Sequence, residues 1–88
     1  MDEKQIRTAI IDALDAAYVS TFRDEAVREN FLNGSKDYLF EELDIDSLGM
    51  MDFCISLEIN DVISITPEKV LRLNTLNELV QTIQSSGQ

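Results

Sequence analysis

The sequence contains no histidine and only one cysteine among its 88 residues. Histidine is the commonest general base near neutral pH and the commonest metal ligand, so neither role can be filled by it here. The lone Cys54 excludes an intrachain disulfide and a zinc site held by several cysteines. We therefore expect a protein that is not an enzyme, holds no metal and works in a reducing cytoplasm.

Basic residues are scarce as well. The chain has 7 Lys and Arg against 17 Asp and Glu, which gives a net charge of -10. Such a polyanion repels phosphate backbones and anionic lipid surfaces, which argues against nucleic-acid binding and membrane-surface binding. The same charge favours partners that carry basic patches, although surface charge also serves solubility alone.

Long hydrophobic runs are missing too. No segment approaches the roughly 20 apolar residues of a membrane-spanning helix. Residues 1–5 are polar and contain no hydrophobic signal core. We expect a monomer without membrane insertion, and the polar ends at Met1 and Gln88 favour a free-standing protein over an excised domain.

What is present indicates one helical domain. Hydrophobic residues make up 44% of the chain, which suffices for one modest core. The first helix should span about residues 3–19, with Asp2 and Gln5 forming a cap at its start. Its buried stripe follows steps of three and four residues and consists of Ile6, Ile10, Ala13, Leu14, Ala17 and Tyr18.

Residues 20–46 are predicted to form a long loop between the first two main helices. A structureless loop of that length is unusual in a compact domain. We therefore expect a helical turn or two at residues 25–32, followed by a turn at Asn33–Gly34. The residues expected to anchor the rest of the loop to the core are Leu39, Phe40 and Leu43.

The second helix should span about residues 47–60, with either Asp46 or Ser47 as its N-cap. A short third helix is expected at about residues 67–71, because Thr66-Pro67 suits an N-cap followed by proline at the first helical position.

The last helix is expected at about residues 75–84, capped by Asn74 or Thr75 and followed by a frayed tail at residues 85–88. The predicted fold is therefore all-α, a small bundle of three main helices plus one short helix.

The second helix is apolar on two sides. At about 100° per residue, one stripe consists of Met50, Phe53, Cys54 and Leu57, and the other of Leu48, Met51, Ile55 and Ile59. A surface helix needs only one such stripe for its core. The second stripe is either core, covered by Phe31, Leu39 and Phe40 of the long loop, or an exposed surface for a partner or a hydrophobic cargo. The sequence leaves both interpretations open.

Three roles are considered for Ser47: a catalytic nucleophile, a member of a calcium-binding loop, and the N-cap of a helix. A nucleophilic serine needs an adjacent base, and the chain has no histidine and no lysine next to Ser47. The loop that starts at Asp44 begins like an EF-hand but has Ile55 where a bidentate Glu is required. Without further context, N-capping is the ordinary role of an Asp-Ser pair at a helix start.

The residues around Ser47 change this interpretation. Residues 43–48, Leu-Asp-Ile-Asp-Ser-Leu, resemble the modification site of acyl carrier proteins, whose core is Asp-Ser-Leu at the start of the second helix. Residues 37–43 resemble the stretch that leads into that site. Later features with matching spacing are Leu57-Glu58, Ile65-Thr66-Pro67-Glu68 and Asn74-Thr75-Leu76. The resemblance covers about residues 37–84, and the first helix only by its pattern.

The resemblance implies a carrier. Ser47, flanked by Asp46 and Leu48, would carry 4′-phosphopantetheine, attached through a phosphodiester by a phosphopantetheinyl transferase that uses coenzyme A. The positive end of the helix would favour the phosphate. The thiol of the arm would hold acyl groups as thioesters and present them to acyl-loading, acyl-transfer or condensing enzymes with basic docking patches. The residues that would face these partners are Met51, Asp52, Ile55 and Glu58.

Some residues depart from the family pattern. Asp44 stands where glycine is usual, and Gly49 where an acid often follows Asp-Ser-Leu. Gly49 should also cost about 1 kcal/mol of helix stability relative to alanine. Asp61 stands where relatives bury a residue, with Val62 or Ile63 as substitutes.

These departures favour a specialised carrier in a dedicated fatty-acid-like, lipid or polyketide pathway. Two alternatives remain open: an aminoacyl or peptidyl carrier, and an unmodified acidic module for protein–protein interaction.

Overall fold

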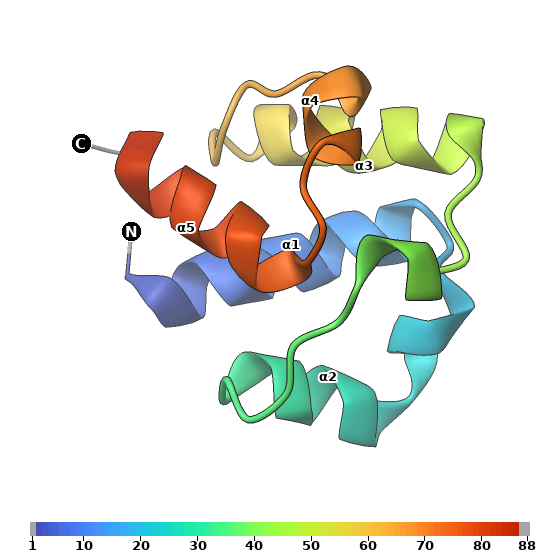
Figure 1. Cartoon of the computed structure of the whole chain (residues 1–88), viewed down its shortest axis with the longest axis vertical. Helices are drawn as coiled ribbons and strands as arrows, with labels where there is room; N and C mark the ends of the chain where they lie inside the picture. Colours follow the sequence, from blue (N-terminus) through green and yellow to red (C-terminus); the bar gives the residue numbers. More distant parts are fainter. Residues whose placement is uncertain (1, 87–88) are drawn as a thin grey trace.

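The computed structural model describes residues 2–86, and its regular elements are helices (Figure 1). In chain order they are α1 (Glu3–Ala16), a 3₁₀ turn (Ser20–Arg23), α2 (Glu25–Leu32), a second 3₁₀ turn (Phe40–Glu42), α3 (Ser47–Ile59), α4 (Pro67–Leu71) and α5 (Leu76–Ser86). Within residues 2–86 the only β-type pairing is an isolated bridge between Leu39 and Thr75. The all-α expectation is confirmed.

Helix α1 lies at the centre and contacts α2, α3 and α5. Its start matches the prediction: Asp2 Oδ1 accepts from the Gln5 N–H at 2.8 Å, and Gln5 Oε1 accepts from the Asp2 N–H at 3.0 Å. The predicted end at residue 19 is wrong, because the helix stops at Ala16. The next turn places Tyr18 at a φ of 59°, where its side chain leaves the core and is exposed.

The helical turns expected at residues 25–32 are confirmed: within segment 20–46 these residues form α2, a helix of 8 residues. Asp24 caps it by accepting from the Ala26 N–H at 2.8 Å. The helix ends at the predicted Asn33–Gly34 turn, where Gly34 has a φ of 75°. Segment 20–46 is thus organised around its own helix.

Buried Arg7 joins α2 to α1. Its Nη1 donates to the Phe31 carbonyl at 2.9 Å, and its guanidinium lies 4.8 Å from the centre of the Phe31 ring. Phe31 also meets Phe22 edge to face, with ring centres 5.7 Å apart. Phe31 therefore packs on the α1–α2 side of the core and does not cover the second stripe of α3, as one of the two interpretations required.

The three expected loop anchors behave differently. Leu43 is buried, and Phe40 is half-buried with its ring centre 6.5 Å from that of Phe53. The Leu39 side chain is partly exposed, contrary to expectation. The backbone holds this part of the loop instead, because the Phe40 N–H donates to the Asn74 carbonyl and the Leu76 N–H to the Tyr38 carbonyl, both at 2.9 Å.

The last two helices begin as predicted. Thr66 caps α4 by accepting from the Lys69 N–H at 3.3 Å, and Thr75, not Asn74, accepts from the Glu78 N–H at 3.2 Å. The frayed tail was wrong for residues 85–86, since α5 continues through Ser86. Residues 87–88 lie outside the described part of the chain.

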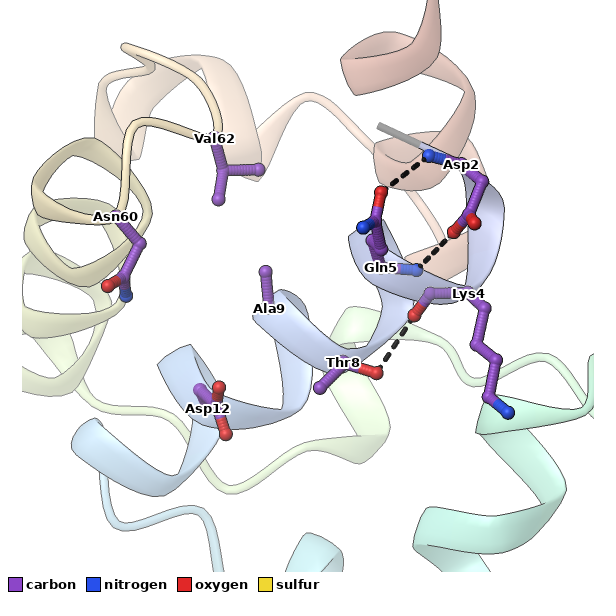
Figure 2. Close-up of a pocket in the computed structure, with 8 residues that line it drawn as sticks. All are labelled: Asp2, Lys4, Gln5, Thr8, Ala9, Asp12, Asn60 and Val62. Carbon is purple, nitrogen blue, oxygen red and sulfur yellow. Dashed lines mark hydrogen bonds between the residues drawn. The ribbon is translucent and has the colours of Figure 1, made fainter.

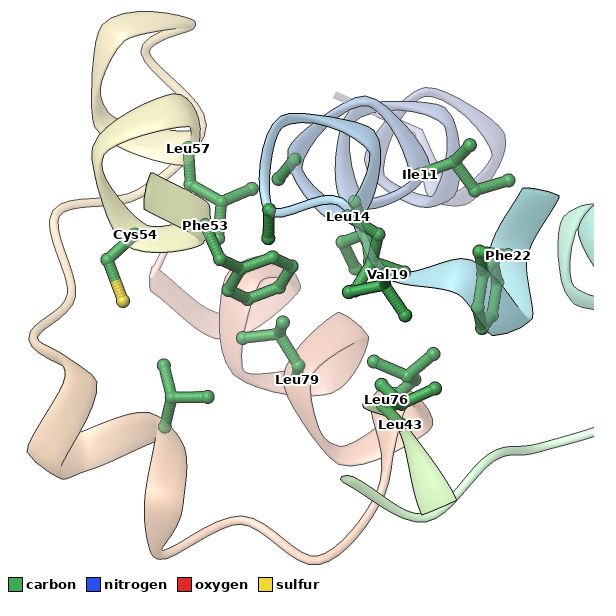
Figure 3. Packing of buried hydrophobic residues seen from close by; sticks show 14 of the residues in the cluster. Ile11, Leu14, Val19, Phe22, Leu43, Phe53, Cys54, Leu57, Leu76 and Leu79 are labelled. Carbon is green, nitrogen blue, oxygen red and sulfur yellow. The ribbon is translucent and has the colours of Figure 1, made fainter. Parts of the chain in front are cut away.

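The core lies between α1, α3 and α5 (Figure 3). Leu14 from α1, Phe53 and Leu57 from α3, and Leu79 from α5 are fully buried. Full burial of such a side chain stabilises the fold by about 1.5–3 kcal/mol. These contacts fix the orientation of α3, and therefore decide which of its faces meets solvent.

Candidate functional site

The site is the start of α3, and the segment before it is firmly placed. Buried Leu43 and half-buried Ile45 face the core on either side of exposed Asp44. The Ile45 N–H donates to the Leu43 carbonyl at 2.9 Å. The chain therefore enters α3 in a defined direction, with the residues just after Ile45 at the surface.

Asp46 is the N-cap of α3. Its Oδ1 accepts from the Gly49 N–H at 2.6 Å, and its carbonyl accepts from the Met50 N–H at 2.9 Å. The sequence left Asp46 and Ser47 as equal candidates for this role. The structure assigns the cap to Asp46, so Ser47 becomes the first residue of the helix.

Ser47 is exposed, and its hydroxyl makes no hydrogen bond with any of residues 2–86. The first N–H groups of a helix have no partner inside it, and the helix dipole places partial positive charge at the same end. An anionic group attached to the Ser47 oxygen would lie against this positive end. The hydroxyl is thus accessible and uncommitted, and suited to a phosphate ester.

The second apolar stripe of α3 is exposed. Leu48 is 73% exposed, Met51 52%, Ile55 47% and Ile59 76%, whereas Phe53 and Leu57 are fully buried. The interpretation that the long loop covers this stripe is therefore wrong. We call Leu48, Met51 and Ile55 the α3 face; together with Ser47 they lie along the first two turns of the helix.

Charged residues border the α3 face. Asp52 and Glu58 are both exposed on α3, as the predicted partner-facing role requires. From Asp37 to Glu68 the sequence contains nine acidic residues and no Lys or Arg. Residues 37–68, which include Ser47 and all of α3, therefore account for -9 of the net charge of -10.

Two hollows include residues at the start of α3. One is a groove of about 450 Å³ whose lining is mostly apolar and includes Phe40, Ile45 and Met50, with Glu41 and Asn74 as its polar members. The groove reaches the start of α3 through Ile45 and Met50.

The other hollow, of about 310 Å³, lies between the end of α1 and the first turn of α3. It is lined by Ala17, Tyr18, Asp44, Asp46, Leu48, Gly49 and Asp52. Tyr18 is the residue that sequence reasoning missed, because the periodic pattern assigned it to the buried stripe of the first helix.

A third pocket lies away from Ser47, between the first half of α1 and the segment after α3 (Figure 2). Its volume is about 440 Å³. Several of its polar groups are already engaged: Asp2 and Gln5 bond each other in the helix cap, and the Thr8 hydroxyl donates to the Lys4 carbonyl at 2.9 Å. These bonds serve the start of α1, so this pocket contributes nothing to the site at Ser47.

Other kinds of site find little support. Within residues 2–86, no group of three His, Cys, Asp or Glu side chains is arranged to hold a metal ion, and no helix is long and apolar enough to cross a membrane. Burial of Cys54 raises the pKa of its thiol through desolvation. A buried thiol with a raised pKa is a poor nucleophile, so Cys54 acts as a small core residue.

Comparisons of the chain with protein-family models, curated proteins and solved structures found no match. Its function is therefore inferred from its residues and their geometry.

Proposed function

We propose that this protein is an acyl carrier protein that bears a 4′-phosphopantetheine arm on Ser47. The observation that carries the proposal is the division of roles at the start of α3. Asp46 caps the helix, which leaves the Ser47 hydroxyl exposed and without a hydrogen bond to residues 2–86. A serine that served only as a cap would use its oxygen on the helix N–H groups, as Asp46 does here.

The arm would be attached by a phosphopantetheinyl transferase that takes it from coenzyme A. The Ser47 oxygen would bond to the phosphorus next to the pantetheine part of coenzyme A, while the P–O bond of the pyrophosphate bridge breaks and 3′,5′-ADP leaves. The transferase would supply the base that takes the hydroxyl proton, because this chain has no histidine. The phosphodiester would then lie at the positive end of α3, which favours its negative charge. The thiol at the end of the arm would hold the cargo as a thioester.

An apolar cargo fits the surroundings of Ser47 better than a polar one. The groove of about 450 Å³ beside the start of α3 is lined largely by aliphatic and aromatic side chains. This favours an acyl group over an aminoacyl or peptidyl group, since burial of an apolar chain is driven by removal of its surface from water. A fatty-acid-like, lipid or polyketide pathway in the cytoplasm would supply such cargo.

Partner enzymes would dock on the α3 face. The combination of exposed Leu48, Met51 and Ile55 with exposed Asp52 and Glu58 suits a partner surface with an apolar centre and basic residues around it. This description fits the transferase as well as acyl-loading and condensing enzymes.

The second candidate function is an unmodified interaction module. The exposed α3 face favours it too, because apolar surface of this kind marks protein contacts in general. The two functions differ in whether Ser47 is modified and whether the arm carries a cargo.

Acyl loading tests the proposal. The purified chain is incubated with a broad-specificity phosphopantetheinyl transferase and acyl-coenzyme A, and its intact mass is measured before and after treatment with neutral hydroxylamine. The carrier function predicts a gain equal to the acylated arm, of which hydroxylamine removes only the acyl part. An unchanged mass would favour the interaction module.

A further inference from the structure

Three helices of this fold end with the same backbone pattern. In each, the N–H of the third residue after the helix donates to the carbonyl five residues earlier: Val19 to Leu14 after α1, Ser35 to Asn30 after α2, and Val62 to Leu57 after α3, at 2.9–3.1 Å. The residue before each donor has a positive φ, 59° at Tyr18, 75° at Gly34 and 59° at Asp61. This arrangement is the Schellman motif, whose left-handed position is usually glycine.

Of the three residues with a positive φ, Tyr18 is the one whose backbone conformation is strained. Glycine adopts a positive φ without strain and Asp tolerates it, whereas a bulky side chain in this region is strained. The side chain gains nothing for the fold in return. It is 74% exposed, and within residues 2–86 it has no hydrogen bond and no aromatic partner. Glycine at this position would serve the turn better, so the turn does not explain the tyrosine.

The position of Tyr18 relates it to the α3 face. The ends of the two helices are in direct contact, since a Cβ added to Gly49 would lie 3.2 Å from the Ala17 carbonyl oxygen. Tyr18 and exposed Leu48 both line the hollow of about 310 Å³ between these helices, and Asp44, Asp46 and Asp52 line it as well. Tyr18 thus extends the exposed apolar surface from α3 across to the end of α1, next to Ser47.

We propose that Tyr18 is a specificity-determining residue of the docking surface, where it receives a basic side chain of the enzyme that modifies Ser47; this rests on the proposed carrier function. A Lys or Arg in the hollow would meet an aromatic ring and carboxylates together, and each attracts a cation. The occupant is a protein surface with a basic side chain set among apolar neighbours, which matches the charge and apolar character of the α3 face.

Kinetics of arm transfer test this role. The probe is a broad-specificity phosphopantetheinyl transferase with coenzyme A, and the rate of mass gain is followed for wild type, Tyr18→Gly, Tyr18→Asn and Tyr18→Phe. The matched control is Asp61→Gly, which relieves a left-handed residue of equal φ beyond the far end of α3. Ile59, the last residue of α3, is about 18 Å from Ser47 along the axis at roughly 1.5 Å per residue, and Asp61 follows it by two residues. Melting temperatures are recorded for every variant.

We expect Tyr18→Gly and Tyr18→Asn to keep or raise the melting temperature and to lower kcat/KM about fivefold through KM, as the loss of one aromatic–cation contact does. Tyr18→Phe and Asp61→Gly should transfer the arm at the wild-type rate. An unchanged kcat/KM in Tyr18→Gly, or a fall in rate that accompanies a fall in melting temperature, would overturn the role of Tyr18. No mass gain in wild type would instead contradict the carrier function itself, and this proposal with it.

Discussion

Asp46 and Ser47 are neighbours with separate tasks, and their substitutions should separate them. Asp46→Ala removes the acceptor of the Gly49 N–H and should lower the free energy of unfolding by about 1 kcal/mol. Ser47→Ala removes an exposed hydroxyl without a hydrogen bond in the described chain and should change it by less than about 0.5 kcal/mol. Urea denaturation measures both. Equal losses would show that Ser47 shares the capping role.

The tertiary structure explains why glycine occupies position 49, which the sequence alone does not. From propensity alone, glycine in a helix is a cost of about 1 kcal/mol relative to alanine. In the fold, however, Gly49 is buried against the end of α1, and an added Cβ would lie 3.1 Å from Asp46 Oδ1 and 3.2 Å from the Ala17 carbonyl oxygen. The close approach of the capping carboxylate and of the α1 backbone thus accounts for glycine at this position.

Gly49→Ala should therefore destabilise the protein despite the better helix propensity. Moving the end of α1 to admit a methyl group costs about 1–3 kcal/mol, as overpacking of a tight contact does, and this exceeds the gain of about 1 kcal/mol from propensity. We expect a net loss of about 1 kcal/mol in urea denaturation. A variant more stable than wild type would mean that the end of α1 moves to admit the methyl group at little cost in free energy.

At the scale of elements, helix starts could be predicted from sequence better than helix ends. The caps at Asp2, Thr66 and Thr75 are side-chain acceptors with a clear local signature. The end of α1 depends on the left-handed backbone at Tyr18. Tyrosine has no preference for this conformation, so the sequence did not predict where the helix ends. Gly34 was recognised because glycine carries that signal in the sequence.

The two stripes of α3 were visible in the sequence, but their environments were not. A period of 3.6 residues places side chains on faces and cannot say which face another element covers. Which face of α3 is covered depends on segment 20–46. Phe31 of this segment lies in α2 and contacts Arg7 of α1, so its ring does not pack on α3. Ser47 was proposed as a candidate site from local sequence, whereas the exposure of the face beside it could be seen only in the tertiary structure.

Truncations along α3 should show this asymmetry in stability. Phe53→Ala should cost about 3–5 kcal/mol and Leu57→Ala about 2–5 kcal/mol, because both side chains are fully buried. Met51→Ala and Ile55→Ala remove half-exposed side chains and should cost distinctly less, yet slow acyl loading of the carrier. Urea melts and loading assays on the four variants check this. Equal losses of stability at Ile55 and Leu57 would contradict an exposed docking face.

At the scale of the whole molecule, the distribution of charge matters more than its total. Composition predicted an acidic protein, and the positions of the charges add that the segment from Asp37 to Glu68, which contains Ser47 and all of α3, has no Lys or Arg. The cations lie elsewhere, several of them in ion pairs such as Arg28–Asp15 and Arg7–Glu3. A partner with a basic patch would therefore be oriented toward the start of α3.

This orientation predicts salt-sensitive docking. Asp52→Lys and Glu58→Lys should each slow transfer of the arm several-fold, and added salt should weaken the wild-type reaction. Glu29→Lys on α2 is the matched control, because it makes the same change of net charge at an exposed position of a helix that lies across α1 from α3 (Figure 1). Kinetics across a salt series measure the effect. Rates independent of salt, or an equal loss in Glu29→Lys, would argue against local docking on α3.

Attachment of the arm to Ser47 can be tested by intact-mass measurement of a serine variant. Wild type, Ser47→Ala and the exposed loop control Ser64→Ala are each incubated with coenzyme A and a broad-specificity transferase, and circular dichroism confirms that all three are folded. We predict that wild type and Ser64→Ala each gain the mass of one phosphopantetheine arm, and that Ser47→Ala gains none. A mass gain retained in folded Ser47→Ala, or no gain in wild type, would contradict the account.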